Sequence, residues 1–132
     1  MHEWAIAESI VKYISNNYRG RAIVGLTIAV GRLQNIDKDI LVFNVKELLK
    51  IEGFREVDVR VRDIGISLRC RFCSYKWSIN PEDLGEDISE MIHFIPESIY
   101  AYVKCPKCNS RDFEIVTGRG VYIEEIVEVV EA

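Results

Sequence analysis

Four cysteines fall into two pairs, and each pair has the spacing of a metal-binding turn. The pairs are Cys70-Arg-Phe-Cys73 and Cys105-Pro-Lys-Cys108, with 31 residues between them. Two intervening residues let a tight turn direct both thiolates at one ion, and two such turns complete a tetrahedral site of four sulfurs. Zinc and a rubredoxin-like mononuclear iron share this ligand set, and zinc is favoured because it is redox-inert. Since no position remains for water, we expect a structural Zn(II).

Two histidines are the other scarce metal ligands, and one of them follows the initial methionine. In Met1-His2-Glu3 the free amine, the amide nitrogens of His2 and Glu3 and the His2 imidazole can reach one ion through small chelate rings. Nitrogen donors in a plane suit Ni(II) or Cu(II). His93 is the only other imidazole in the chain. Each histidine also has an ordinary interpretation, an exposed terminal residue for His2 and a half-buried residue bonded to backbone for His93.

The elements that must position these ligands begin with two helices and a strand. Apolar residues at three- and four-residue steps predict a helix over 4–18, and β-branched residues predict a buried strand over 22–30. Asp37 as N-cap and Gly53 as terminator delimit a second helix. The predicted apolar face of the first helix consists of Trp4, Ala7, Val11, Ile14 and Tyr18. That of the second consists of Ile40, Leu41, Val45, Leu48 and Leu49.

The order of these elements predicts a small α/β layer. Residues 56–63 alternate valines with charged residues, which is typical of a strand with one exposed face. A helix between two strands normally crosses over and leaves them parallel, and residues 120–130 can supply a third strand. We therefore predict an α+β or α/β fold with two parts. Residues 1–66 and 117–132 form a mixed three-stranded sheet with two helices, and residues 67–116 form an inserted zinc-ribbon-like module with two C-x-x-C knuckles.

The composition disfavours two broad function classes. Among 132 residues, 17 are basic and 21 acidic, which gives a net charge of −4. That balance, with no basic stripe expected beside the cysteines, argues against a nucleic-acid partner, because phosphate binding depends on clustered Lys and Arg. We do not expect an enzyme, because the chain has no activated nucleophile, no open zinc position and no glycine-rich phosphate loop.

One acidic segment stands out, because residues 78–103 contain six carboxylates and no lysine or arginine. We interpret it as a solvated linker, whose first half Pro81 and Gly85 make a loop. The alternative interpretation is a surface that attracts cations or a basic partner. The longest apolar run, 23–30, is too short for a membrane span and is broken by Gly25, so a cytoplasmic location is expected. Cysteines there are reduced, which favours metal ligation over disulfides.

Several motifs together resemble the HypA family of hydrogenase maturation factors over essentially the whole chain. They are the Met1-His2-Glu3 start, Val30-Gly31-Arg32-Leu33, the two C-x-x-C pairs, and Gly118-Arg119-Gly120 before the last strand. The resemblance implies a nickel metallochaperone that binds Ni(II) at the N-terminus for [NiFe]-hydrogenase maturation. It further implies delivery with a HypB-type GTPase to the hydrogenase large subunit. Urease maturation stays open as a second task.

The resemblance also assigns ligands. It implies that His2 and the backbone of Glu3 bind nickel. It also implies that structural zinc is bound by the four cysteines, Cys70, Cys73, Cys105 and Cys108. The long gap between the pairs looks like the archaeal form, in which a histidine in the equivalent of 92–97 completes the nickel site, and this makes His93 a further candidate. We expect a monomer or a weak dimer, without nucleic-acid or membrane partners. The alternative function is a zinc-ribbon adaptor that binds protein or nucleic acid and has no nickel role.

Overall fold

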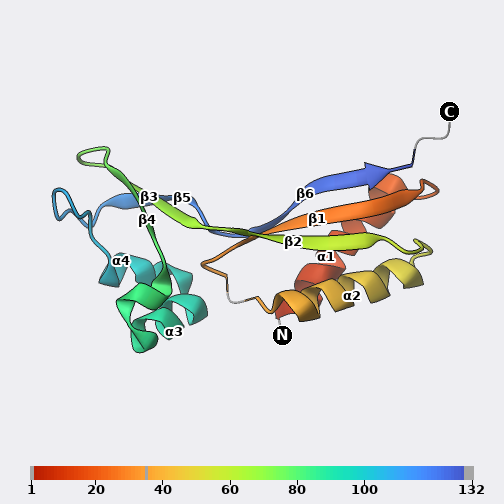
Figure 1. The fold of residues 1–132 in the computed structure, drawn as a ribbon, viewed down its shortest axis with the longest axis horizontal. Coiled ribbons are helices and arrows are strands. Elements are labelled where there is room, and N and C mark those ends of the chain that lie inside the picture. The colour runs from red at the N-terminus through yellow and green to blue at the C-terminus, as the bar shows by residue number, and fades with distance from the viewer. Residues whose placement is uncertain (1, 35, 130–132) are drawn as a thin grey trace. The chain divides into compact units, whose positions relative to one another are not determined.

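Backbone contacts divide the chain into two units, each with its own three-stranded sheet (Figure 1). The structure is a computed structural model that describes residues 2–34 and 36–129. Unit 1 comprises Met1–Ala29, Ile36–Arg62 and Val121–Ala132, and unit 2 comprises Val30–Asn35 and Asp63–Gly120. Among the helices of the described residues, none is long and apolar enough to cross a membrane.

Unit 1 begins with helix α1, His2–Tyr18, and strand β1, Ile23–Gly31, as the periodicity predicts. Three residues of the predicted helical face are buried, namely Ala7, Val11 and Ile14. Trp4 departs from that pattern, because its ring is 48% exposed in the first turn of the helix. Gly20 follows the helix with a φ of 78°, a conformation that glycine adopts without strain.

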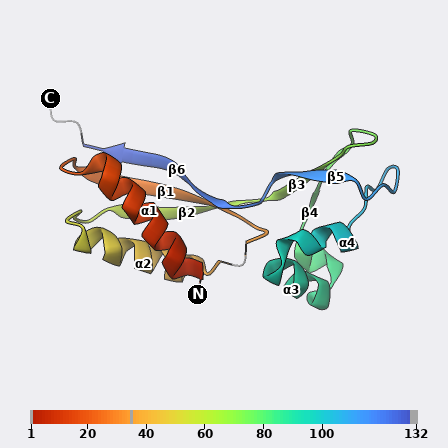
Figure 2. The same ribbon diagram turned by 180° about the vertical axis from the view of Figure 1, so that it is seen from behind.

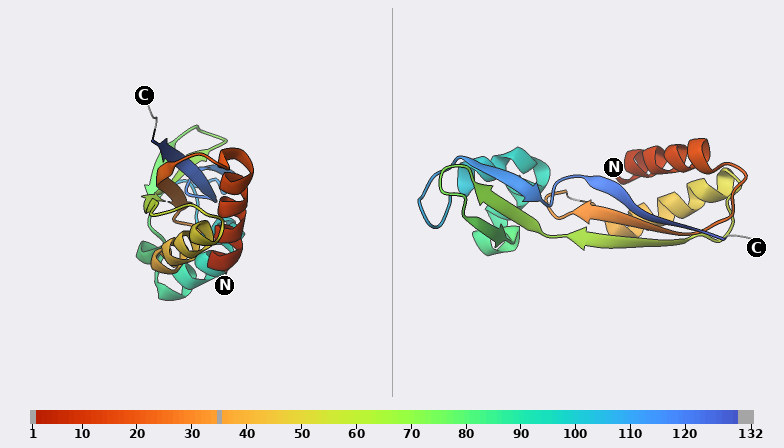
Figure 3. Two further views of the ribbon diagram at one scale, coloured as in Figure 1. Left: turned by 90° about the vertical axis from the view of Figure 1, so that its right-hand side faces the viewer. Right: turned by 90° about the horizontal axis from the view of Figure 1, so that it is seen from above.

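Helix α2, Lys38–Ile51, has the predicted N-cap: the Asp37 carboxylate accepts a hydrogen bond of 3.1 Å from the Ile40 N–H. The buried residues of its apolar face are Leu41, Val45 and Leu49. Ile40 was predicted on that face but is exposed. Figures 1 and 2 and the right-hand view of Figure 3 show α1 and α2 together on one face of the unit 1 sheet.

The unit 1 sheet has the order β2-β1-β6, where β2 is Asp58–Ile64 and β6 is Val121–Glu128. The Arg32 N–H donates to the Ile64 carbonyl at 2.9 Å, and Gly25 lies beside Asp58, so β1 and β2 run parallel as predicted. The third predicted strand is present as β6, although Val130 at the predicted end lies outside the described residues. It runs antiparallel to β1, because Gly31 N–H donates to Gly120 and Val129 N–H to Ala22.

Unit 2 contains an antiparallel sheet of order β4-β3-β5. Its strands are β3, Ile66–Cys70, β4, Lys76–Ile79, and β5, Phe113–Thr117. Four short helical segments connect β4 to β5: the 3₁₀ turns η1, Pro81–Leu84, and η2, Pro96–Ser98, and the helices α3, Glu86–Phe94, and α4, Ile99–Tyr102. The core of the unit consists of Leu33, Ile66, Leu68, Ile92, Ile99, Val103 and Phe113.

The interpretation of the acidic segment as a solvated linker was wrong. Ile92 and Ile99 from this segment are completely buried, because the acidic residues occupy the outer face of α3 while the apolar ones pack against the sheet. The predicted loop in its first half was also wrong. Pro81 instead starts the 3₁₀ turn η1, and Gly85, with a φ of 99°, caps the start of α3.

The two glycine motifs lie side by side inside unit 2. The Gly31 N–H donates to the Gly120 carbonyl at 2.8 Å, and the Leu33 N–H donates to the Gly118 carbonyl at 2.9 Å. A side chain at Gly31 would collide with the backbone of Gly118. The close approach of two backbones therefore requires glycine at position 31, whereas Gly118 and Gly120 have positive φ angles of 105° and 85°.

Candidate metal centres

The two cysteine knuckles have the same backbone structure. In the first, the Cys70 N–H donates to the Tyr75 carbonyl at 2.9 Å and the Ser74 N–H donates to the Cys70 carbonyl at 3.0 Å. In the second, Cys105 N–H donates to Ser110 and Asn109 N–H donates to Cys105, both at 2.8 Å. Each turn therefore closes the same two rings around its first cysteine.

Each knuckle has a residue in the left-handed region directly after its second cysteine. Asn109 has a φ of 63°, a conformation that asparagine tolerates. Ser74 has a φ of 65° at the equivalent position, and sequence reasoning missed it because serine carries no preference for that region. Only its place directly after Cys73 signals the role.

The structure brings all four predicted zinc ligands together. The sulfurs of Cys70 and Cys108 lie 3.5 Å apart, those of Cys73 and Cys105 lie 3.6 Å apart, and all four fall within 4.8 Å of one another. A tetrahedral ion with metal–sulfur bonds of about 2.3 Å requires sulfur separations of about 3.8 Å. The donor set and its dimensions fit one tetrahedral metal ion.

The electrostatics of the four thiols also favour a bound cation. The backbone N–H of Cys73 lies 3.4 Å from the Cys70 sulfur and is the main cause that lowers the pKa of Cys70 to about 6, against the effect of burial. The Ser110 N–H favours the Cys108 thiolate, yet burial and the neighbouring sulfurs raise the pKa of Cys108 to about 12. Four thiolates this close repel one another, and a divalent cation removes that repulsion.

The predicted nickel ligands at the amino terminus lie at the start of α1. The side chain of His2 is outside the described residues, as is Met1. The carboxylate of Glu3 is buried and accepts a hydrogen bond of 2.9 Å from the Asp37 N–H, so it links the first turn of α1 to the cap of α2. Amide nitrogens in the first turn of a helix have no partner within the helix. The backbone N–H of Glu3 instead hydrogen-bonds to the carboxylate of the same residue.

His93 lies in α3 of unit 2, whereas His2 belongs to unit 1. Its imidazole is half-buried, as its ordinary interpretation expected. The hydrogen bond to backbone in that interpretation is not found: within the residues that the structure describes, the His93 imidazole forms no hydrogen bond or ion pair.

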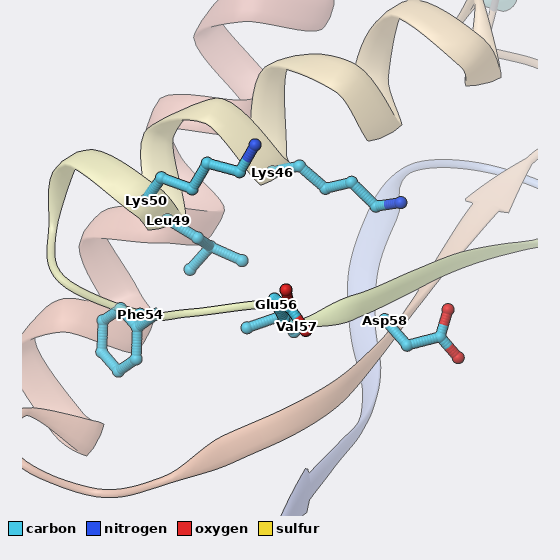
Figure 4. Close-up of a pocket in the computed structure, with 7 residues that line it drawn as sticks. All are labelled: Lys46, Leu49, Lys50, Phe54, Glu56, Val57 and Asp58. Atoms are coloured by element: carbon cyan, nitrogen blue, oxygen red, sulfur yellow. The ribbon is translucent and has the colours of Figure 1, made fainter.

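A pocket of about 320 Å³ between the end of α2 and the start of β2 contains none of the predicted ligands (Figure 4). The amines of Lys46 and Lys50 lie along one side of it, and the carboxylates of Glu56 and Asp58 lie along the other. Its apolar lining consists of Leu49, Phe54 and Val57. Charges of both signs face the same space without a nucleophile or a metal-binding set, so the pocket carries no assignable chemistry.

The expectation that no basic stripe lies beside the cysteines was wrong. Basic residues flank both knuckles, but they lie in two segments, 69–76 and 104–111, that are far apart in sequence. The folded site brings the two segments together. A count of charges on both sides of each pair would have revealed them.

Comparison with known proteins identifies the family. A family model described as "Hydrogenase/urease nickel incorporation, metallochaperone, hypA" matches residues 1–128. The chain belongs to the HypA family. The hydrogenase maturation factors HypA of Pyrococcus horikoshii and of Thermococcus onnurineus are each 37% identical to it over 131 residues, which cover 96% of this chain and 94% of each relative. The predicted membership and its archaeal type are confirmed.

Solved HypA structures share the fold. The solution structure of the Ni metallochaperone HypA from Helicobacter pylori matches with a TM-score of 0.59 and 17% identity, and covers 98% of both chains. A second HypA solution structure matches with a TM-score of 0.64 and 18% identity, over 99% of this chain and 98% of the other. At these identities the likeness concerns the fold alone, and it confirms the predicted mixed α/β class. The four-cysteine module is seen in the clustered sulfurs of this chain.

Proposed function

We propose that this HypA family member binds Ni(II) at its amino terminus and delivers it for the maturation of [NiFe]-hydrogenase. The observation that carries the proposal is the anchored start of α1. The buried Glu3 carboxylate accepts a hydrogen bond from the Asp37 N–H, so the first turn of α1 has a fixed place beside the cap of α2. Backbone nitrogens together with an adjacent imidazole are the donors that Ni(II) prefers.

In this proposal His2 binds nickel through its imidazole and backbone nitrogen, and Glu3 binds it through its backbone nitrogen. The Glu3 carboxylate has a different role, because its bond to Asp37 holds the helix start in position. His93 is the less certain ligand, and its support is an imidazole with no hydrogen bond to the described residues. A site at a chain end opens by local motion, which suits an ion that must be released.

The four cysteines hold a structural zinc ion in this proposal. The support is the set of sulfur separations and the burial of Cys70 and Cys105. Zinc would supply folding free energy to unit 2, because a closed tetrahedral site has no open position for chemistry. The residues of the chain prepare the site: the two knuckles orient the thiolates, and the Cys73 N–H stabilises the charge on Cys70.

The decisive experiment measures both metals in the same protein. Native mass spectrometry should find one zinc ion in the purified protein, and one zinc plus one nickel ion after addition of Ni(II). His2→Ala should lose nickel and keep zinc, and so should a protein with one glycine added before Met1, because the free amine is displaced. Glu8→Ala is the matched control on the exposed side of α1 and should bind both metals.

His93→Ala separates the less certain ligand from the others. Weaker nickel binding by calorimetry, with zinc unchanged, would assign His93 to the site, whereas wild-type affinity would remove it. Unchanged nickel binding in His2→Ala and in the extended protein would refute the whole proposal.

The partners follow from the same proposal. A HypB-type GTPase would exchange nickel with this protein in the cytoplasm, and the hydrogenase large subunit would receive it. The support is the name of the relatives, hydrogenase maturation factor. Nickel-loaded protein mixed with such a GTPase should lose its nickel signal to the partner faster than nickel dissociates from the protein alone.

A further inference from the structure

The metal site gathers an unusual number of cations on one surface. Six of the 17 basic residues and none of the 21 acidic ones lie in the segments 69–76 and 104–111. Because the four sulfurs meet, the two loops of these segments lie side by side at one end of unit 2 (Figures 1 and 2). We call this region the knuckle surface. It consists of Arg69, Arg71, Phe72, Lys76, Lys104, Lys107 and Arg111.

Only two of these six cations are paired with carboxylates of the described residues. Arg69 pairs with Glu114 at 2.7 Å and Arg71 with Asp112 at 3.0 Å. Arg111 donates to the Ala101 carbonyl. In the part of the chain that the structure describes, no ion pair involves the remaining three, Lys76, Lys104 and Lys107. All six side chains are exposed, and they outnumber the net negative charge that four thiolates leave on a divalent ion.

A large apolar ring lies among these cations. Phe72 stands between the two cysteines of the first knuckle and is 82% exposed. Exposure of such a ring to water is unfavourable. Burial of a phenylalanine side chain contributes roughly 1.5–3 kcal/mol to the free energy of folding or binding. An aromatic residue surrounded by charged ones is the usual composition of a protein-binding surface, with an apolar anchor and a polar rim.

We propose that the knuckle surface binds an acidic segment of a partner protein, whose carboxylates face the three lysines and whose apolar side chain covers Phe72. Charge complementarity supports an acidic partner, because the cations are exposed and three of them lack internal partners. A protein segment fits better than a nucleic acid for two reasons. The chain as a whole has a net charge of −4, and the same unit carries the acidic residues Glu86, Asp87 and Glu90 on α3, which repel a long polyanion.

The proposal does not depend on nickel, since none of its residues is a nickel ligand. Its test therefore uses zinc-loaded protein without nickel, so that its failure leaves the nickel proposal untouched. The probe is a fluorescein-labelled peptide of glutamates around one phenylalanine, and fluorescence anisotropy measures its binding. We expect binding that weakens as salt concentration rises, and we expect no binding of the same peptide with glutamines in place of glutamates.

Matched variants locate the binding. Lys104→Glu with Lys107→Glu should weaken it about tenfold, which corresponds to roughly 1.4 kcal/mol. The control variant, Lys12→Glu with Lys46→Glu, makes the same change of net charge on unit 1 and should have little effect on peptide binding. Phe72→Ala should weaken binding several-fold, and Phe43→Ala, which removes a ring that is 63% exposed on α2, should not.

Three results would overturn the proposal. The first is equal loss of binding in both lysine double variants, which would mean that only net charge matters. The second is tighter binding of a labelled single-stranded oligothymidine than of the peptide at physiological salt, with the same dependence on Lys104 and Lys107. The third is self-association of the free protein in sedimentation that the Lys104/Lys107 variant abolishes, because the acidic partner would then be a second copy.

Discussion

The two units of this protein each have a three-stranded sheet but differ in how they are stabilised. Unit 1 places helices of 17 and 14 residues on its sheet, with a core of side chains at regular spacing. The helices of unit 2 have nine and four residues, and its first and third cysteines, Cys70 and Cys105, are completely buried. Apolar burial stabilises unit 1, whereas unit 2 combines a smaller core with four cysteines that converge on one point.

Removal of one metal ligand should give the largest effect and separate the two units. Cys105→Ser replaces a buried thiolate by a hydroxyl that binds zinc poorly, so unit 2 should lose zinc and roughly 3 kcal/mol or more of unfolding free energy. Unit 1 should stay folded. The chain offers a reporter for each unit, Trp4 in α1 and Trp77 in β4, and the variants Trp77→Phe and Trp4→Phe isolate them in urea titrations followed by fluorescence.

A chelator added to the wild-type protein serves as the control, because it should reproduce the effect of Cys105→Ser without a mutation. Simultaneous unfolding of both reporters in Cys105→Ser would show that the units are not independently stable. Full zinc content in that variant would contradict the four-thiolate site itself.

The next effect concerns the close approach of two backbones in unit 2. Gly31→Ala would place a methyl group against the Gly118 carbonyl, where neither backbone can move without loss of the Leu33 hydrogen bond. Overpacking of this kind costs about 3 kcal/mol, and the Trp77 reporter should show it. Gly65→Ala is the matched control: a Cβ there would meet no atom within 4 Å, so its stability should stay close to wild type. Equal stability of the two variants would mean that the contact at Gly31 is easily relieved.

The difference between the units also explains what could be predicted from the sequence. Unit 1 follows local rules: Ala7, Val11 and Ile14 have helical spacing, and Val57 and Val59 alternate with exposed residues, so both patterns predict what is buried. The cysteine site was predictable for the same reason, because two short spacings define the ligands. Periodicity alone predicted Trp4 and Ile40 on the core face, but both are exposed. Periodicity does not show how far along a helix the neighbouring elements extend to cover it.

Unit 2 could not be predicted in the same way, because its structure depends on contacts between distant segments. Ile92 and Ile99 enter the core from a segment whose six carboxylates made it resemble a linker. The pairing of β3 with β5 joins residues such as Cys70 and Phe113, which no local pattern relates. The two halves of the basic knuckle surface are visible in the sequence only as separate basic segments, and the fold joins them into one surface.

The smallest expected effect compares the two knuckles within unit 2. Ser74 and Asn109 have nearly the same positive φ, 65° and 63°, but asparagine tolerates this region better than serine does. Ser74→Gly should therefore raise the unfolding free energy of unit 2 by about 0.5 kcal/mol, because relief of backbone strain exceeds the entropy that glycine adds to the unfolded chain. Asn109→Gly should change it less. Urea titrations with the Trp77 reporter measure both, and the Trp4 reporter should be unaffected. A larger gain at Asn109 than at Ser74 would mean that the hydrogen bonds of each turn, rather than the φ of its left-handed residue, determine the stability of the knuckle.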